Sequence, residues 1–292
     1  MGDFQTALGE YINIYRKQRH ISIRALAPGR DTTLSRFLNR GNKVSVQLIT
    51  DAMRRMGLQY ADLAGDFPRF NAPFTTAAEN LMAHRYAADS SAITAIADAY
   101  LGETATAKGK IAELNRLVFE HIKSVSEAQQ MSLLPEATQA AIEEVLADNA
   151  DWLIYDYLLL RLTVGFLSDT RVARCYLLLK RQMGQMATGY QHYANDAMLQ
   201  CGIILLTRRL DEQLADFYSD SETAQAKIYN FQDALVFNAV RRMIAGRVGS
   251  AVSEETLNEV FAATTTVELP QVEGYLRRLL AAANGEVKGV FL

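Results

Sequence analysis

One short segment of the sequence combines side chains that can contact base edges with side chains that can hold phosphates. It runs from Thr32 to Asn42 and reads TTLSRFLNRGN. If the segment is helical, its spacing places four polar residues on one face: Thr32, Ser35, Arg36 and Asn39. The opposite face is then apolar and consists of Leu34, Phe37 and Leu38. Hydroxyl, amide and guanidinium groups bind base edges and phosphates, so the segment is either a DNA recognition helix or an ordinary helix with a solvated face.

Seven residues of this segment and the loop after it are candidate DNA contacts: Thr32, Thr33, Ser35, Arg36, Arg40, Asn42 and Lys43. Arg36 is the first choice, because an arginine on an exposed helix face pairs two donors with guanine or holds a phosphate. The three hydroxyl residues could equally cap the helix start. The last three suit phosphate contact, which Arg30 and Gln47 could extend, and solvated charge is the alternative for all of them.

The elements that must position this segment are short helices in the first 64 residues. An apolar face is expected on the first helix, from Leu8, Tyr11, Ile12 and Tyr15. Ser22 can cap the second helix, which Pro28 and Gly29 would end, and Asp31 or Thr32 can cap the third. A fourth helix would bury one stripe, made of Val46, Ile49, Met53 and Met56, and a last turn would span Tyr60 to Gly65. Five short helices with a tight turn between the second and third are typical of a helix-turn-helix domain.

The distribution of charge also separates the start of the chain from the rest. The net charge of the whole chain is −3, which by itself argues against a nucleic-acid-binding protein. Residues 1–64, however, carry 10 Lys/Arg against 5 Asp/Glu, while the other residues carry 20 against 28. A basic unit joined to an acidic one is the pattern expected when one domain of a protein binds DNA.

The remainder of the sequence predicts an almost entirely helical body. Residues 65–74, GDFPRFNAPF, contain two prolines and are the expected linker, and after them only Pro135 and Pro270 occur. The helices expected in residues 75–292 span approximately 75–88, 91–101, 105–126, 136–148, 151–167, 170–187, 190–207, 208–218, 222–246, 253–264 and 270–283. Such spacing suggests stacked helix pairs, as in tetratricopeptide-like arrays. The predicted fold class is therefore all-α: a helix-turn-helix domain followed by a right-handed array of antiparallel helix pairs.

In the body, six residues are candidate peptide contacts: Tyr157, Arg161, Tyr190, Asn195, Asn230 and Asn238. Arg161 lies in a segment that is apolar nearly all round, so its guanidinium needs a partner, either a peptide carboxylate or backbone or a structural ion pair. The asparagines could bind a peptide backbone or be ordinary helix-surface amides. The two tyrosines, with Tyr193, could line the same site or simply pack in the core.

Other classes of protein are not indicated. No stretch of 18 uninterrupted apolar residues occurs, and no secretory signal pattern precedes the first helix, so a cytoplasmic protein without a membrane span is expected. Cys175 and Cys201 lie in apolar patterns and are expected to be core residues. The four histidines are scattered, and no catalytic, metal or cofactor pattern is found, so neither an enzyme nor a cofactor is expected.

Several motifs resemble the Rgg/GadR/MutR family of transcriptional regulators. They are ISIRALA, LSRF, RGN and VSVQLITDAMRRMGLQYADL, and the resemblance from Leu34 to Leu63 needs no gap. The segment PGRDTT is shorter than the turn of the family, and Leu38 stands where glutamate is usual. The body resembles the family around Trp152 and Phe166, where members carry an aromatic-rich helix pair.

The resemblance implies a function. Members are cytoplasmic regulators with an Xre-type helix-turn-helix head, and a tetratricopeptide-like body that binds short hydrophobic signalling peptides and forms homodimers. We therefore expect a homodimer that binds a roughly palindromic operator in double-stranded DNA under control of such a peptide. The alternative is a helical protein that sequesters a protein partner, with a vestigial or nonspecific DNA-binding head.

Overall fold

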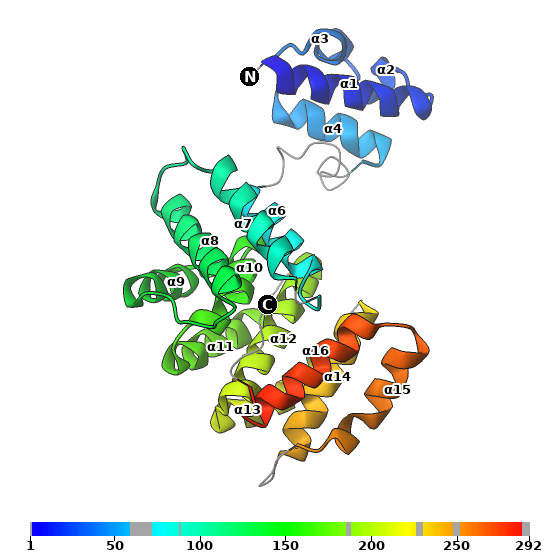
Figure 1. The fold of residues 1–292 in the computed structure, drawn as a ribbon. Helices are drawn as coiled ribbons and strands as arrows, with labels where there is room; N and C mark the ends of the chain where they lie inside the picture. Colours follow the sequence, from blue (N-terminus) through cyan, green and yellow to red (C-terminus); the bar gives the residue numbers. More distant parts are fainter. Residues whose placement is uncertain are drawn as a thin grey trace. The chain divides into compact units, whose positions relative to one another are not determined.

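The computed structural model describes residues 2–58, 72–87, 89–184, 188–225, 230–247 and 252–287. These ranges form fifteen α-helices and three short 3-10 helices and contain no strand, which confirms the predicted all-α fold class. The chain divides into two compact units, Met1–Asn71 and Ala72–Leu292, which we name the head and the body. Figure 1 shows the helices of each unit. None of the described helices is long and apolar enough to cross a membrane.

The head contains four described helices around its own apolar core: α1 (Gly2–Gln18), α2 (Ile23–Leu26), α3 (Asp31–Arg40) and α4 (Val46–Met56). The core includes Leu8 and Ile12 of α1, Leu26 of α2 and the predicted apolar face of α3. Helix α1 contacts α3 and α4, and α2 also contacts both. The expected last turn, Tyr60 to Gly65, lies outside the described residues, as does the linker up to residue 71.

In the head, the predicted cap of α2 is confirmed and the predicted cap of α3 is not. Ser22 caps α2 as predicted, because its Oγ accepts a hydrogen bond from the Ala25 amide. The prediction of a cap at Asp31 or Thr32 was wrong: both residues lie inside α3, whose N-cap is Arg30 without a side-chain hydrogen bond. The acidic side chain at the first position of α3 instead interacts favourably with the helix dipole.

The buried stripe predicted for α4 was partly wrong. Ser45 caps this helix by accepting from the Leu48 amide, so Val46 is the first helical residue. At that position Val46 is 73% exposed, and Leu48 and Ala52 are buried instead, together with Met53 and Met56.

Helices α1 and α3 approach each other closely because two glycines lie at the contact. A Cβ atom added at Gly9 of α1 would lie 2.5 Å from the Phe37 carbonyl oxygen of α3. Gly41, which ends α3, has φ +62, and a Cβ added there would collide with Thr6 of α1. The left-handed conformation at Gly41 also closes the helix, since its amide donates to the Phe37 carbonyl.

The body consists of eleven described α-helices: α6 (Pro73–Ala83), α7 (Ser90–Glu103), α8 (Lys110–Ala128), α9 (Glu136–Asp148), α10 (Ile154–Thr163), α11 (Asp169–Met183), α12 (Gln191–Arg208), α13 (Asp211–Gln225), α14 (Phe231–Gly246), α15 (Asn258–Thr266) and α16 (Pro270–Ala283). Short 3-10 helices span Val164–Phe166, Thr188–Tyr190 and Glu254–Leu257. Most helices pack on the next one along the chain, as expected for stacked helix pairs. The predicted helix at 222–246 was wrong, because α13 continues to Gln225 and a new helix begins at Phe231, capped by Asn230.

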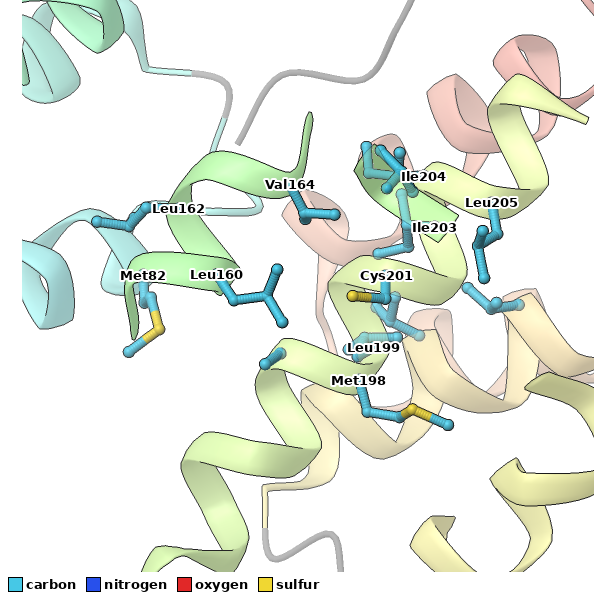
Figure 2. Close-up of a cluster of buried hydrophobic side chains, with 14 of the residues drawn as sticks. Met82, Leu160, Leu162, Val164, Met198, Leu199, Cys201, Ile203, Ile204 and Leu205 are labelled. Atoms are coloured by element: carbon cyan, nitrogen blue, oxygen red, sulfur yellow. The ribbon is translucent and has the colours of Figure 1, made fainter. Parts of the chain in front are cut away.

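Helix α12 lies at the centre of the body. It contacts α10, α11, α13, α14 and α16, and its residues from Ala197 to Leu206 are all buried. Figure 2 shows part of this apolar cluster, with Cys201 on α12, Leu160 on the neighbouring α10, and Met82 of α6 beyond it. Both cysteines, Cys175 and Cys201, are free and buried, which confirms them as core residues.

We predict that Gly9→Ala destabilises the head by about 1–3 kcal/mol, because the added methyl group cannot fit against the α3 backbone. Denaturation of the full chain followed by circular dichroism reports both units, while fluorescence of the buried Trp152, the single tryptophan, reports the body. The variant should lower the denaturant midpoint of the head and leave the Trp152 transition unchanged. Gly102→Ala in α7, where an added Cβ meets nothing within 4 Å, is the matched control, and an equal effect of both substitutions would contradict the packing argument.

Candidate functional sites

The first candidate site is the polar face of α3 and the loop that follows it. The three apolar residues of the segment are buried, at 0–2% exposure: Leu34, Phe37 and Leu38. Six of the seven predicted DNA contacts are exposed, namely Thr32, Thr33, Arg36, Arg40, Asn42 and Lys43, and Ser35 is half-buried. Five of the seven belong to α3, and Asn42 and Lys43 follow directly after its C-cap, Gly41.

Two neighbours of this surface make local contacts. Asn39 donates to the Ser35 carbonyl oxygen at 2.9 Å, so part of its hydrogen-bonding capacity is used within the helix. Arg30 lies 3.3 Å from the Asp51 carboxylate, so its positive charge has a partner within the head and needs no phosphate. Arg36, Arg40 and Lys43 make no ion pair with any described carboxylate, so their charges are available to a polyanion.

The second candidate site is a group of buried polar side chains in the body, contributed by residues far apart in the sequence. Arg85, just after α6, lies 2.5 Å from the Asp233 carboxylate of α14, and the Tyr86 hydroxyl donates to the same carboxylate. The side chains of Arg85 and Asp233 are only 14% and 9% exposed. Burial lowers the pKa of Arg85, but the interactions with Tyr86 and with the Asp196 and Asp233 carboxylates, including the hydrogen bond to Asp233, outweigh it, so the pKa is raised and the guanidinium stays charged.

Arg161 of α10 lies near this ion pair but does not take part in it. Arg161 is 5% exposed, and its Nη1 atom is buried without a hydrogen-bond partner among the described residues. Burial lowers the pKa of Arg161, and the main opposing contribution is the charge of Asp196 on α12. The pKa of Asp196 is itself raised by burial, against the attraction of Arg85 and Arg161. A buried guanidinium with an unused donor needs an explanation, and binding of an anionic or carbonyl group is one.

The other predicted peptide contacts are dispersed. Tyr157 is 1% exposed and its ring packs against Trp152 at 5.3 Å, so it belongs to the core. Asn195 is buried on α12 beside Asp196, and Asn238 of α14 is half-buried. Asn230 is exposed and its side chain accepts from the Gln232 amide, which makes it the cap of α14.

The two tyrosines near the start of α12 pack at the edge of the core. Tyr190 is half-buried, and the Tyr193 hydroxyl donates to Glu79 of α6 at 2.6 Å.

Sequence reasoning missed Arg85, Tyr86, Asp196 and Asp233. Arg85 and Tyr86 lie in the turn after α6, and Arg85 and Asp233 are separated by 148 positions, so no local spacing of residues predicts their contact. In the described part of the chain, no group of three His, Cys, Asp or Glu side chains lies close enough to hold a metal ion.

Comparison with known proteins establishes the fold. No protein-family model matches the sequence, and no curated protein matches it. Among solved structures, the chain is similar to the SHP pheromone receptor Rgg2 of Streptococcus dysgalactiae, with a TM-score of 0.70 and 14% identity, covering 96% of this chain and 100% of the receptor. It is also similar to a protein of Listeria monocytogenes EGD-e described as a candidate transcriptional regulator, with a TM-score of 0.71 and 10% identity, covering 97% and 99% of the two chains.

These similarities extend over both units, so the chain has the fold of Rgg2 over nearly its full length. The predicted fold class, a helix-turn-helix head followed by a tetratricopeptide-like body, is confirmed. The similarity also agrees with the resemblance found in the sequence motifs. Neither solved structure is described as an enzyme.

We predict that Asp233→Ala destabilises the body by about 3 kcal/mol or more, because it leaves the Arg85 guanidinium and the Tyr86 hydroxyl buried without their acceptor. The measurement is denaturation of the full chain followed by Trp152 fluorescence. Asp98→Ala is the control, since Asp98 pairs with Lys123 at the surface, where ion pairs contribute little. A midpoint for Asp233→Ala no lower than that of the control would show that the buried pair is not needed for folding.

Proposed function

We propose that this protein is a sequence-specific DNA-binding transcriptional regulator controlled by a short hydrophobic peptide bound in its body. The observation that carries the DNA-binding half is the surface of α3, where exposed hydroxyls, an amide and cations without an ion pair to any described carboxylate lie over a fully buried apolar face. In helix-turn-helix proteins the corresponding helix enters the major groove. The fold shared with a pheromone receptor supports the proposal.

In this proposal Arg36 contacts a base edge or phosphate, the hydroxyls of Thr32, Thr33 and Ser35 contact the DNA near the helix start, and the loop cations hold phosphates. Two copies of the chain form a homodimer in the cytoplasm, so that two heads bind half-sites about one turn of DNA apart in a roughly palindromic operator. The peptide regulates DNA binding only if it binds two states of the body with different affinities.

The peptide-binding half of the proposal depends on Arg161. A protein gains no folding stability from a buried guanidinium that lacks a partner, and an apolar side chain of similar size is often as stable or more stable at such a position. Retention of a costly charged group is typical of functional sites, where stability is sacrificed for binding. A peptide carboxylate or backbone carbonyl would satisfy the free Nη1 donor. Asn195, one position before Asp196, would supply an amide to the same peptide.

We predict that Arg36→Ala and Lys43→Ala weaken DNA binding in different ways. Arg36→Ala should cost about 1–3 kcal/mol on the specific site only, whereas Lys43→Ala should weaken binding to all sequences and reduce the salt dependence by about one unit. Fluorescence anisotropy of the full chain with DNA from upstream of its own gene and with scrambled DNA, at several salt concentrations, measures both effects. If the parent binds both duplexes equally, or if both variants bind like the parent, α3 does not recognise DNA and a protein-sequestering body becomes the better hypothesis.

We also predict that Arg161→Met removes peptide binding while the denaturant midpoint of the body stays the same or rises. Binding is measured with a pool of hydrophobic octapeptides that carry free carboxylates and with the same pool amidated at the C-terminus. If the parent protein prefers the free acids, the peptide group that binds Arg161 is the C-terminal carboxylate. If it binds both pools equally, that group is a backbone carbonyl. Binding by the variant as tight as by the parent, or a large loss of stability, would instead make Arg161 a structural residue.

A further inference from the structure

The head carries a second group of cations, outside the surface of α3. Five exposed residues lie where α1 and α4 end and along α2: Lys17, Arg19, Arg24, Arg54 and Arg55. We name this group the basic pole. It holds half of the ten Lys/Arg residues in positions 1–64.

Two contacts of the group itself, and one in the neighbouring turn, bring the ends of these helices together. Arg55 of α4 donates from Nη1 to the Ala25 carbonyl of α2, at 3.4 Å. The Arg19 guanidinium lies against Gly57, the C-cap of α4, because Nη1 is 3.5 Å from the position of an added Cβ there. The turn between α1 and α2 is held by Arg16, which donates to the Ile21 carbonyl at 2.8 Å. The ends of α1 and α4 and the short helix α2 therefore share one side of the head.

Within the described part of the chain, no carboxylate neutralises the cations of the basic pole. None of the five forms an ion pair with a described carboxylate, and the single ion pair found in the described part of the head is Arg30–Asp51. In the body, by contrast, arginines such as Arg171, Arg208 and Arg277 pair with Asp or Glu. A fold that needs these charges for its own stability would be expected to pair them in the same way.

Interaction with helix dipoles accounts for only part of this pattern. Cations in the last turn of a helix contribute about 0.3–1 kcal/mol each at low salt, which gives a reason for Lys17 in α1 and for Arg54 and Arg55 in α4. It gives little for Arg24, because α2 has only four residues, and none for placing five like charges where they repel one another. Four of the five are arginines, whose planar guanidinium matches phosphate oxygens with two hydrogen bonds.

We propose that the basic pole binds phosphates of the DNA backbone beyond those next to α3. This inference rests on the proposed function, in which α3 lies in the DNA groove. Helix α2 contacts both α3 and α4, so the recognition surface and the basic pole are joined through it. The basic pole thus lengthens the DNA segment that one head holds, and it contributes affinity without sequence preference.

The test measures how DNA affinity depends on salt. The full chain is titrated against a fluorescein-labelled duplex of 30 base pairs and arbitrary sequence over a series of KCl concentrations. The triple variant Arg19→Gln/Arg54→Gln/Arg55→Gln should reduce the slope of log affinity against log salt by about three units, and lower affinity roughly tenfold per lost contact near 0.1 M salt. Circular dichroism checks that the variant is folded. If it is not, Lys17→Gln/Arg24→Gln, whose side chains make no hydrogen bond with described residues, should reduce the slope by about two units.

A matched control removes three exposed cations from the body: Lys108→Gln/Arg116→Gln/Arg181→Gln. It should leave the slope unchanged, and an equal reduction would mean that net charge alone is responsible, which overturns the proposal. An unchanged slope in the basic-pole variant also overturns it. If that variant instead changes the sedimentation coefficient of the free protein, the basic pole is a contact between copies of the chain.

Failure of this inference can be told apart from failure of the proposed function. If Arg36→Ala loses sequence selectivity while the basic-pole variant keeps the parent slope, only the basic pole is refuted. If the parent binds no duplex at all, both are refuted.

Discussion

The close approach of α1 to α3 is the constraint on which the head depends. Gly9 and Gly41 allow the two backbones to pack without a side chain between them, and this contact buries the apolar face of α3. Because that face is fully buried, the opposite face has to lie in solvent, with Arg36 exposed. The orientation of the candidate recognition surface therefore follows from the packing of the apolar face of α3.

In the body the corresponding constraint is the cost of burying charge. Helix α12 is surrounded by apolar helices, so every ionised group near it must find a partner. Asp233 satisfies Arg85 and Tyr86 together, and their network joins the turn after α6 to α14. Arg161 remains with an unused donor in the same environment. The difference between the satisfied and the unsatisfied arginine is what distinguishes a structural ion pair from a candidate binding residue.

The two candidate sites use arginine in opposite environments. In the head, exposed guanidinium groups are hydrated and screened, so each contributes modestly and many contacts are needed for tight binding to DNA. In the body the Arg161 guanidinium is buried and has lost its hydration, and one correctly placed acceptor changes its free energy strongly. The exposed environment of the head therefore favours a dispersed contact surface for a long polyanion. The buried environment of the body favours a single anchoring group for a short ligand.

The sequence by itself determined the all-α fold class, the amphipathic character of α3 and the cap at Ser22, because each depends on residues within one or two helical turns. It also located the change in charge balance between the first 64 residues and the rest. It misjudged the exposure of Val46 and the position of the cap of α3, and it counted Tyr157 and Asn230 among the candidate ligand contacts. Only the tertiary structure decided that Tyr157 packs against Trp152, that Asn230 caps α14, and that Arg85 meets Asp233. Contacts between residues far apart in the chain depend on how helices pack, and the local spacing of residues carries no record of that packing.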